Sequence, residues 1–157
     1  MADLRALVGA LGFQDVLTLL NSGNVVFTGP RRSPAGVAGS IEAAISARLG
    51  VTSRVTVLTA AAMEEVIAGN ELRDSITNPS RFLVAFLREP GSARLLAPLL
   101  RRDWGNERLA VGAHAAYLWC PAGILESPLS TEVGRLLGDG HTTRNWSTVT
   151  RLGTLLS

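Results

Sequence analysis

The sequence predicts an α+β protein, because apolar residues alternate between helical and strand-like periods along the whole chain. Glycine, proline and asparagine separate these periods, as expected for turns between short elements. The 157 residues are 46% hydrophobic and 18% charged, which is enough apolar material for a packed core without disulfides or metals. We therefore expect sheets covered by helices, in a two-layer arrangement.

The first half follows the order α-β-β-α-β-α. Asn21-Ser22-Gly23-Asn24 joins two β-prone runs and predicts a hairpin, and Ser33 before Pro34 predicts a capped helix start. The segment Arg54–Leu58 alternates with period two and predicts a strand. The expected elements are helices over about 4–11, 34–49 and 60–68, and strands over 16–20, 25–28 and 54–58.

The second half begins with an apolar run that suits a central strand, followed by a helix that contains Pro98 and should kink or end early there. Ser127-Pro128 predicts another capped helix. The expected elements are strands over 82–87, 107–111 and 114–119, and helices over 92–100, 128–137 and 143–157. The aperiodic stretch 71–80 is the predicted linker between subdomains 1–70 and 81–157, unless the halves intertwine as one domain.

Both halves resemble the ferredoxin-like β-α-β-β-α-β pattern. The second half lacks only its last strand, whereas the first half would match if a strand preceded residue 1. That first strand is central in the fold, so its absence would leave a sheet edge unpaired. We therefore expect a missing or borrowed first strand, or a homodimer formed through this edge.

The composition excludes several kinds of chemistry. All 15 basic residues are arginine, so a phosphate-loop lysine and a Schiff base are impossible. The single cysteine, Cys120, allows no internal disulfide, and two histidines with it have no metal-ligand spacing. We expect no metal and no cofactor. A net charge of +2 with scattered arginines argues against nucleic acid without excluding it.

We also expect a cytoplasmic protein with no membrane partner. The mean hydropathy is +0.24, yet no apolar run approaches the roughly 18 residues that a membrane helix needs. The sequence Met-Ala-Asp-Leu-Arg at the start has neither the charged beginning nor the apolar core of a signal peptide.

The stretch Gly138–Val149 concentrates the candidate chemistry. Glycines, two threonine hydroxyls and an arginine at an expected helix start predict an anion site formed by Thr142, Thr143, Arg144 and Asn145. Ser22 and Asn24 would join it if the hairpin met this stretch. The expected ligand is a phosphorylated small molecule or a nucleic-acid backbone.

Two alternatives remain at this point. A hydrolase or transferase acting on a phosphate or acyl group would need His141 or Asp139 near the anion. A purely structural motif would use Arg144 and Asn145 only to brace the chain. We assign no catalytic residue, and we favour a binding protein over an enzyme.

Four segments together resemble a known family. They are Met1–Leu7 with Leu11-Gly12-Phe13, the hairpin Asn21–Phe27, Tyr117–Gly123, and Thr142–Trp146. These motifs are similar to those of bacterial proteins grouped as domain of unknown function 1697 (DUF 1697). The resemblance implies an α+β fold and no assigned activity. Members of that family usually begin with a strand and a glycine-rich loop before the first helix, which agrees with the expected missing strand. Leu20 stands where a polar residue is usual.

Overall fold

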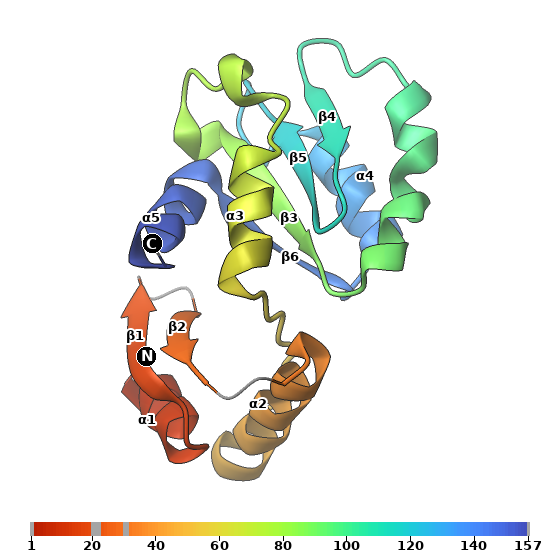
Figure 1. The fold of residues 1–157 in the computed structure, drawn as a ribbon. Helices are drawn as coiled ribbons and strands as arrows, with labels where there is room; N and C mark the ends of the chain where they lie inside the picture. Colours follow the sequence, from red (N-terminus) through yellow and green to blue (C-terminus); the bar gives the residue numbers. More distant parts are fainter. Residues whose placement is uncertain (1, 20–22, 30–31, 157) are drawn as a thin grey trace. The chain divides into compact units, whose positions relative to one another are not determined.

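The computed structural model describes residues 2–19, 23–29 and 32–156 and is shown in Figure 1. It confirms a mixed α+β fold with two sheets. The chain divides into two compact units, one comprising residues 1–59 with 155–157 and the other residues 60–154. The predicted linker 71–80 lies inside the second unit, and the division into folding domains stays a prediction.

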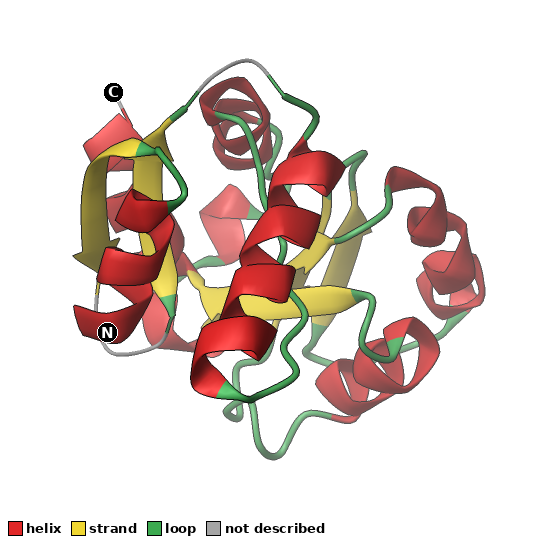
Figure 2. Cartoon of the chain, turned by 90° about the horizontal axis from the view of Figure 1, so that it is seen from below, coloured by secondary structure: helices red, strands yellow, loops and turns green. Residues whose placement is uncertain are grey.

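The first unit contains helix α1 (Ala2–Ala10), strands β1 (Gln14–Leu19) and β2 (Asn24–Thr28), and helix α2 (Pro34–Leu49). The two strands pair antiparallel and lie beside α1, near the label N in Figure 2. As predicted, the Ser33 hydroxyl caps α2 by accepting the Gly36 N–H, and Gly50 ends it with a φ of 70°. A small core joins the helices to the sheet and consists of Leu7, Val8, Phe13, Val37, Ile41 and Ile45.

The strand predicted over Arg54–Leu58 does not form. Val55 and Val57 pack on the core of the first unit, and the Val55 N–H donates to Glu42 Oε1. A period-two pattern makes a strand only when another strand supplies ladder hydrogen bonds. The sheet of the first unit contains just β1 and β2 within the described residues, so Arg54–Leu58 has no strand partner there.

The second unit contains a complete β-α-β-β-α-β pattern. After α3 (Ala60–Ala68) and two 3-10 turns, η1 (Arg73–Ser75) and η2 (Pro79–Arg81), its strands are β3 (Phe82–Leu87), β4 (Arg108–Val111), β5 (Ala115–Trp119) and β6 (His141–Asn145). The strand order is β4-β5-β3-β6, and all neighbours pair antiparallel. The connecting helices are η3 (Pro90–Arg101) and α4 (Pro128–Leu137), and α5 (Trp146–Leu156) follows β6.

Helices cover both faces of this sheet, and all six residues of β3 are therefore buried. On one face, η3 and α4 pack on Leu83, Ala85, Leu87, Ala116 and Leu118. On the other face, the Tyr117 hydroxyl donates to the carbonyl of Val66 in α3 at 2.7 Å. The helix that contains Pro98 is a 3-10 helix that continues to Arg101, so Pro98 does not end it as the sequence suggested.

The helix predicted to start at Thr143 is a second correction. Residues His141–Asn145 form the fourth strand, and α5 begins only at Trp146. These residues form a strand because they pair antiparallel with β3, which lies far away in the sequence. Within the part of the chain that the structure describes, no helix is both long and apolar enough to cross a membrane.

Candidate anion-binding site

Thr142 and Arg144 project from the same face of β6, because side chains alternate along a strand. In the register with β3, Arg144 lies opposite Val84 and Thr142 lies opposite Phe86. The alternate residues His141, Thr143 and Asn145 lie opposite Leu87, Ala85 and Leu83, which belong to the core beneath η3 and α4. Of the four predicted residues of this stretch, the strand therefore brings only Thr142 and Arg144 together on one face.

Two hydrogen bonds of the Arg144 guanidinium lie within its own strand. Its Nη1 donates to the Thr142 hydroxyl at 2.8 Å and to the Thr143 carbonyl at 2.7 Å. The side chain is half-buried, and burial lowers the pKa of Arg144 from its ordinary value. The site therefore presents a partly desolvated positive charge beside a hydroxyl group.

Asn145 has a structural role at the next position. Its side-chain oxygen accepts the Thr148 N–H at 2.9 Å, which makes it the cap of α5. Trp146 then packs edge-to-face on Phe82, with ring centroids 5.7 Å apart. The motif predicted as an anion site is thus divided between the face of β6 that carries Thr142 and Arg144 and the cap of α5.

The two hairpin residues belong to the first unit, and their part in the site stays a prediction. Ser22 lies outside the described residues. Asn24 is buried in the first unit, and its side-chain nitrogen donates to the Leu19 carbonyl across the hairpin at 3.2 Å. This contact explains an asparagine at the hairpin by local structure, because it satisfies a backbone acceptor next to the turn.

His141 points away from Arg144. The two residues are three apart on one strand, so their side chains leave opposite faces. The His141 Nδ1 lies 2.9 Å from the Gly138 carbonyl, within hydrogen-bond distance. The arrangement does not bring His141 to an anion held by Arg144 and Thr142.

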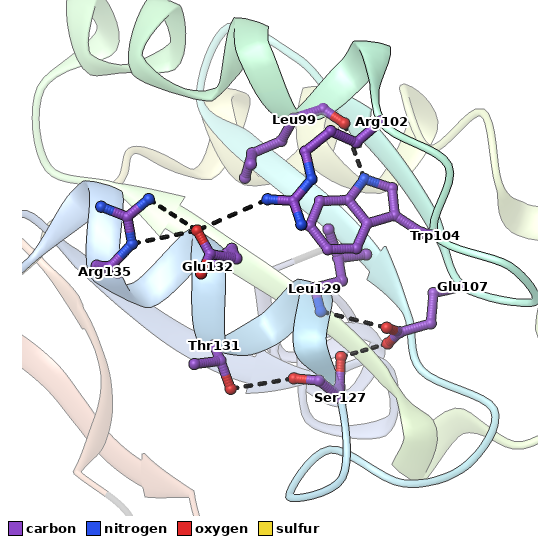
Figure 3. A network of polar contacts seen from close by, with 9 residues as sticks. All are labelled: Leu99, Arg102, Trp104, Glu107, Ser127, Leu129, Thr131, Glu132 and Arg135. Atoms are coloured by element: carbon purple, nitrogen blue, oxygen red, sulfur yellow. Dashed lines mark hydrogen bonds and ion pairs between the residues drawn. The ribbon is translucent and has the colours of Figure 1, made fainter.

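A polar network at the start of α4 was not predicted from the sequence (Figure 3). The Ser127 hydroxyl accepts the Ser130 N–H at 2.9 Å and donates to Glu107 Oε2, while the other Glu107 oxygen accepts the Leu129 N–H at 3.2 Å. A carboxylate at a helix N-terminus is favoured by the exposed N–H groups and the helix dipole. Ser127-Pro128 signals the cap, but nothing in the sequence marks Glu107, 20 residues earlier, as its partner.

Cys120 lies next to this network and is fully buried. Burial raises the pKa of the Cys120 thiol to about 11, and the Glu107 carboxylate adds to this effect. A thiol with such a pKa is protonated near neutral pH and is a poor nucleophile. Cys120 therefore packs as a small apolar residue.

Arg102 contacts two residues near the start of α4, Trp104 and Glu132 (Figure 3). Its guanidinium lies over the Trp104 ring, 4.3 Å from the centroid, and 3.9 Å from the Glu132 carboxylate. Glu132 also pairs with Arg135 at 2.8 Å, and these contacts lower its pKa. Exposed ion pairs of this kind contribute little to the free energy of unfolding. The network therefore orients these side chains without adding much to the stability of the fold.

A histidine–carboxylate pair on the face of the sheet that α3 covers was also not predicted from the sequence. His114 Nε2 lies 3.1 Å from Glu65 Oε2, joining the start of β5 to α3. Glu65 is 69% exposed, which is typical of a surface ion pair. Among the described residues, no group of three or more metal-ligating side chains is found.

Comparisons with known proteins agree with the fold. The family model described as "Protein of unknown function (DUF1697)" matches residues 1–117. A structure of the conserved bacterial protein SP0830 from Streptococcus pneumoniae aligns with a TM-score of 0.77 at 19% identity, covering 100% of this chain and 88% of that one. That likeness shows a shared fold. No curated protein matches the chain. Because the family model covers more than half of the sequence, the chain belongs to the DUF1697 family of proteins of unknown function.

Proposed function

We propose that the second unit binds a phosphorylated small molecule on the face of β6 that carries Arg144 and Thr142. The observation that supports this is the half-buried Arg144 beside the Thr142 hydroxyl, to which its Nη1 donates a hydrogen bond at 2.8 Å. A guanidinium can donate to two oxygens of one phosphate.

The cost of burying the Arg144 charge favours an anionic partner. Burial lowers its pKa, so the cation is less well solvated than an exposed arginine. A bound phosphate would replace the lost solvation by charge-assisted hydrogen bonds. Asn145 caps α5 directly after Arg144, so the positive end of that helix dipole also lies close in sequence to the site.

Binding without turnover is the function best supported. A hydrolase or transferase at this anion would need an acid or base within hydrogen-bond reach. His141 leaves the opposite face of β6 and lies against the Gly138 carbonyl, which argues against that role. The bracing alternative accounts for Asn145, whose side chain caps α5.

A thermal-shift screen tests the proposal. Inorganic phosphate, pyrophosphate, nucleotides, sugar phosphates and a short oligonucleotide are added to wild type, Arg144→Gln and Arg151→Gln. Arg151 is an exposed arginine on α5, so its variant matches the charge change. A ligand that binds only the folded state must raise the melting temperature.

We expect a small phosphorylated molecule to stabilise wild type and Arg151→Gln but not Arg144→Gln. Stabilisation by the oligonucleotide alone would identify a nucleic-acid backbone as the ligand instead. Equal stabilisation of all three proteins, or of none, would contradict the site. We also propose a cytoplasmic location, which fits a buried cysteine that needs no oxidising compartment.

A further inference from the structure

The pairing of strands β3 and β6, which lie side by side in Figure 1, continues for one residue beyond the end of β3. The Arg88 N–H donates to the Gly140 carbonyl at 2.9 Å, which extends the antiparallel register of the two strands. Because side chains alternate along a paired strand, Arg88 projects from the same face as Phe86. Phe86 lies opposite Thr142, so this face carries Arg88 in addition to Thr142 and Arg144.

The register brings Arg88 close to the proposed phosphate site. Its partner across the strands, Gly140, has no side chain that would fill this face. Thr142 is the diagonal neighbour of Arg88, and the Cα atoms of diagonal neighbours lie about 7–8 Å apart, within reach of a long side chain. The Arg144 guanidinium also lies at Thr142, because its Nη1 donates to that hydroxyl. The two guanidinium groups can therefore approach Thr142 from opposite directions along the strand.

Both arginines are partly withdrawn from water. Arg88 and Arg144 are half-buried, and the Nη1 atom of Arg88 is itself buried. Two cations on one face repel each other, and partial burial reduces the screening of this repulsion by solvent. The acids next to the paired ends of the strands, Glu89 and Asp139, are exposed, so an ion pair with either one would be screened. An anion with more than one charge, placed between the two arginines, would offset their repulsion.

We propose that Arg88 is a second arginine of the anion site, and that the ligand carries a diphosphate group. Arg144 and Thr142 bind one phosphate, and Arg88 binds the phosphate next to it. A diphosphate can meet two guanidinium groups at once, whereas a single phosphate engages Arg144 alone. This inference rests on the proposed phosphate site at β6 and adds the chemical class of its ligand.

Calorimetric titration with pyrophosphate and with inorganic phosphate, at one ionic strength, tests the second arginine. The proteins are wild type, Arg88→Gln, Arg88→Lys, Arg144→Gln and Arg94→Gln. Arg94 is an exposed arginine of η3, so its variant matches the loss of charge. Circular dichroism and the melting temperature establish that each variant is folded.

We expect wild type and Arg94→Gln to bind pyrophosphate at least about tenfold more tightly than phosphate. Arg88→Gln should lose this preference and keep the phosphate affinity of wild type. Arg88→Lys keeps the charge but loses the planar fork, so it should show an intermediate preference. Arg144→Gln should lose affinity for both anions.

The inference about Arg88 and the proposed phosphate site fail in different ways. If wild type bound neither anion, the phosphate site at β6 would be wrong, and the role of Arg88 with it. If phosphate binding depended on Arg144 but Arg88→Gln kept the preference for pyrophosphate, the phosphate site would stand and the role of Arg88 would be overturned. An equal loss of affinity for both anions in Arg88→Gln would also overturn it, because Arg88 would then not act on the second phosphate.

Discussion

Arg144 Nη1 lies 2.8 Å from Thr142 Oγ1, and both side chains leave the same face of the edge strand β6. His141, three residues before Arg144, leaves the other face and lies 2.9 Å from the Gly138 carbonyl. Because alternation along one strand separates these groups, a phosphate held by Arg144 and Thr142 would have a hydroxyl beside it and no imidazole. This geometry supports ligand binding more than catalysis.

Replacing Thr142 with valine should weaken phosphate binding without unfolding the protein. Valine keeps the β-branched shape and removes the hydroxyl that lies beside Arg144. A lost hydrogen bond to a charged group corresponds to about 1.5–3 kcal/mol, or roughly a tenfold or larger rise in Kd. Titration with pyrophosphate measures this change. His141→Gln is the control, and an equal loss of affinity in that variant would count against the proposed face.

Asn145→Ala should lower the melting temperature. The substitution removes the side-chain acceptor for the Thr148 N–H and so uncaps α5. Loss of such a cap costs about 1 kcal/mol, which corresponds to roughly 2–4 °C for a protein of this size. Differential scanning calorimetry measures the change, and Asn145→Asp should retain most of the stability. If Asn145→Ala had the same melting temperature as wild type, the Asn145 side chain would not stabilise α5 as a cap.

Glu107→Ala should destabilise the second unit more than an exposed substitution does. The variant removes the acceptor for both the Ser127 hydroxyl and the Leu129 N–H at the start of α4. Leaving half-buried donors without a partner costs about 1–3 kcal/mol. Urea denaturation should show this loss, with Glu64→Ala on the exposed face of α3 as the control. Similar midpoints for the two variants would mean that Glu107 does not stabilise the helix start.

Cys120 should make the free energy of unfolding depend on pH in the alkaline range. Burial raises its pKa to about 11 in the folded protein, whereas an unfolded thiol titrates near 8.5. Below that lower value both states are protonated and this residue causes no pH dependence. Between about pH 8.5 and 11 the folded state retains the proton that the unfolded state loses, so stability falls as pH rises.

Urea denaturation of wild type and Cys120→Ala at pH 7, 9 and 10 measures this dependence. The difference in the free energy of unfolding between the two proteins should shrink as pH rises. A pH-independent difference would show that the thiol has no raised pKa. In parallel, the native thiol should resist Ellman's reagent at pH 8 and react fully in guanidinium chloride.

The two errors in predicting strands have one physical cause. His141-Thr-Thr-Arg-Asn145 has no apolar alternation, and threonine is a good helix cap, so the sequence favoured a helix start. Pairing with the buried strand β3, more than 50 residues earlier, makes it a strand. Arg54–Leu58 alternates well but has no strand partner within the described residues. Local pattern indicates that a segment can form a strand, whereas a distant partner decides whether it does.

Two helix starts were predictable because their signals are local. Ser33-Pro34 and Ser127-Pro128 both begin helices as expected, since cap and proline act within one turn. The two-sided burial of Phe82–Leu87 likewise followed from its uninterrupted apolar sequence. Glu107 could not be identified as a partner of Ser127, because that contact depends on tertiary packing across 20 residues.

Calorimetric titration with pyrophosphate tests the central claim most directly, comparing wild type, Arg144→Gln and Arg151→Gln at two salt concentrations. We predict saturable one-to-one binding by wild type and Arg151→Gln, and at least tenfold weaker binding by Arg144→Gln. Affinity should fall as the salt concentration rises, because the contact is between charges. Equal affinity of Arg144→Gln and wild type, or the absence of saturable heat in wild type, would contradict an anion site at β6.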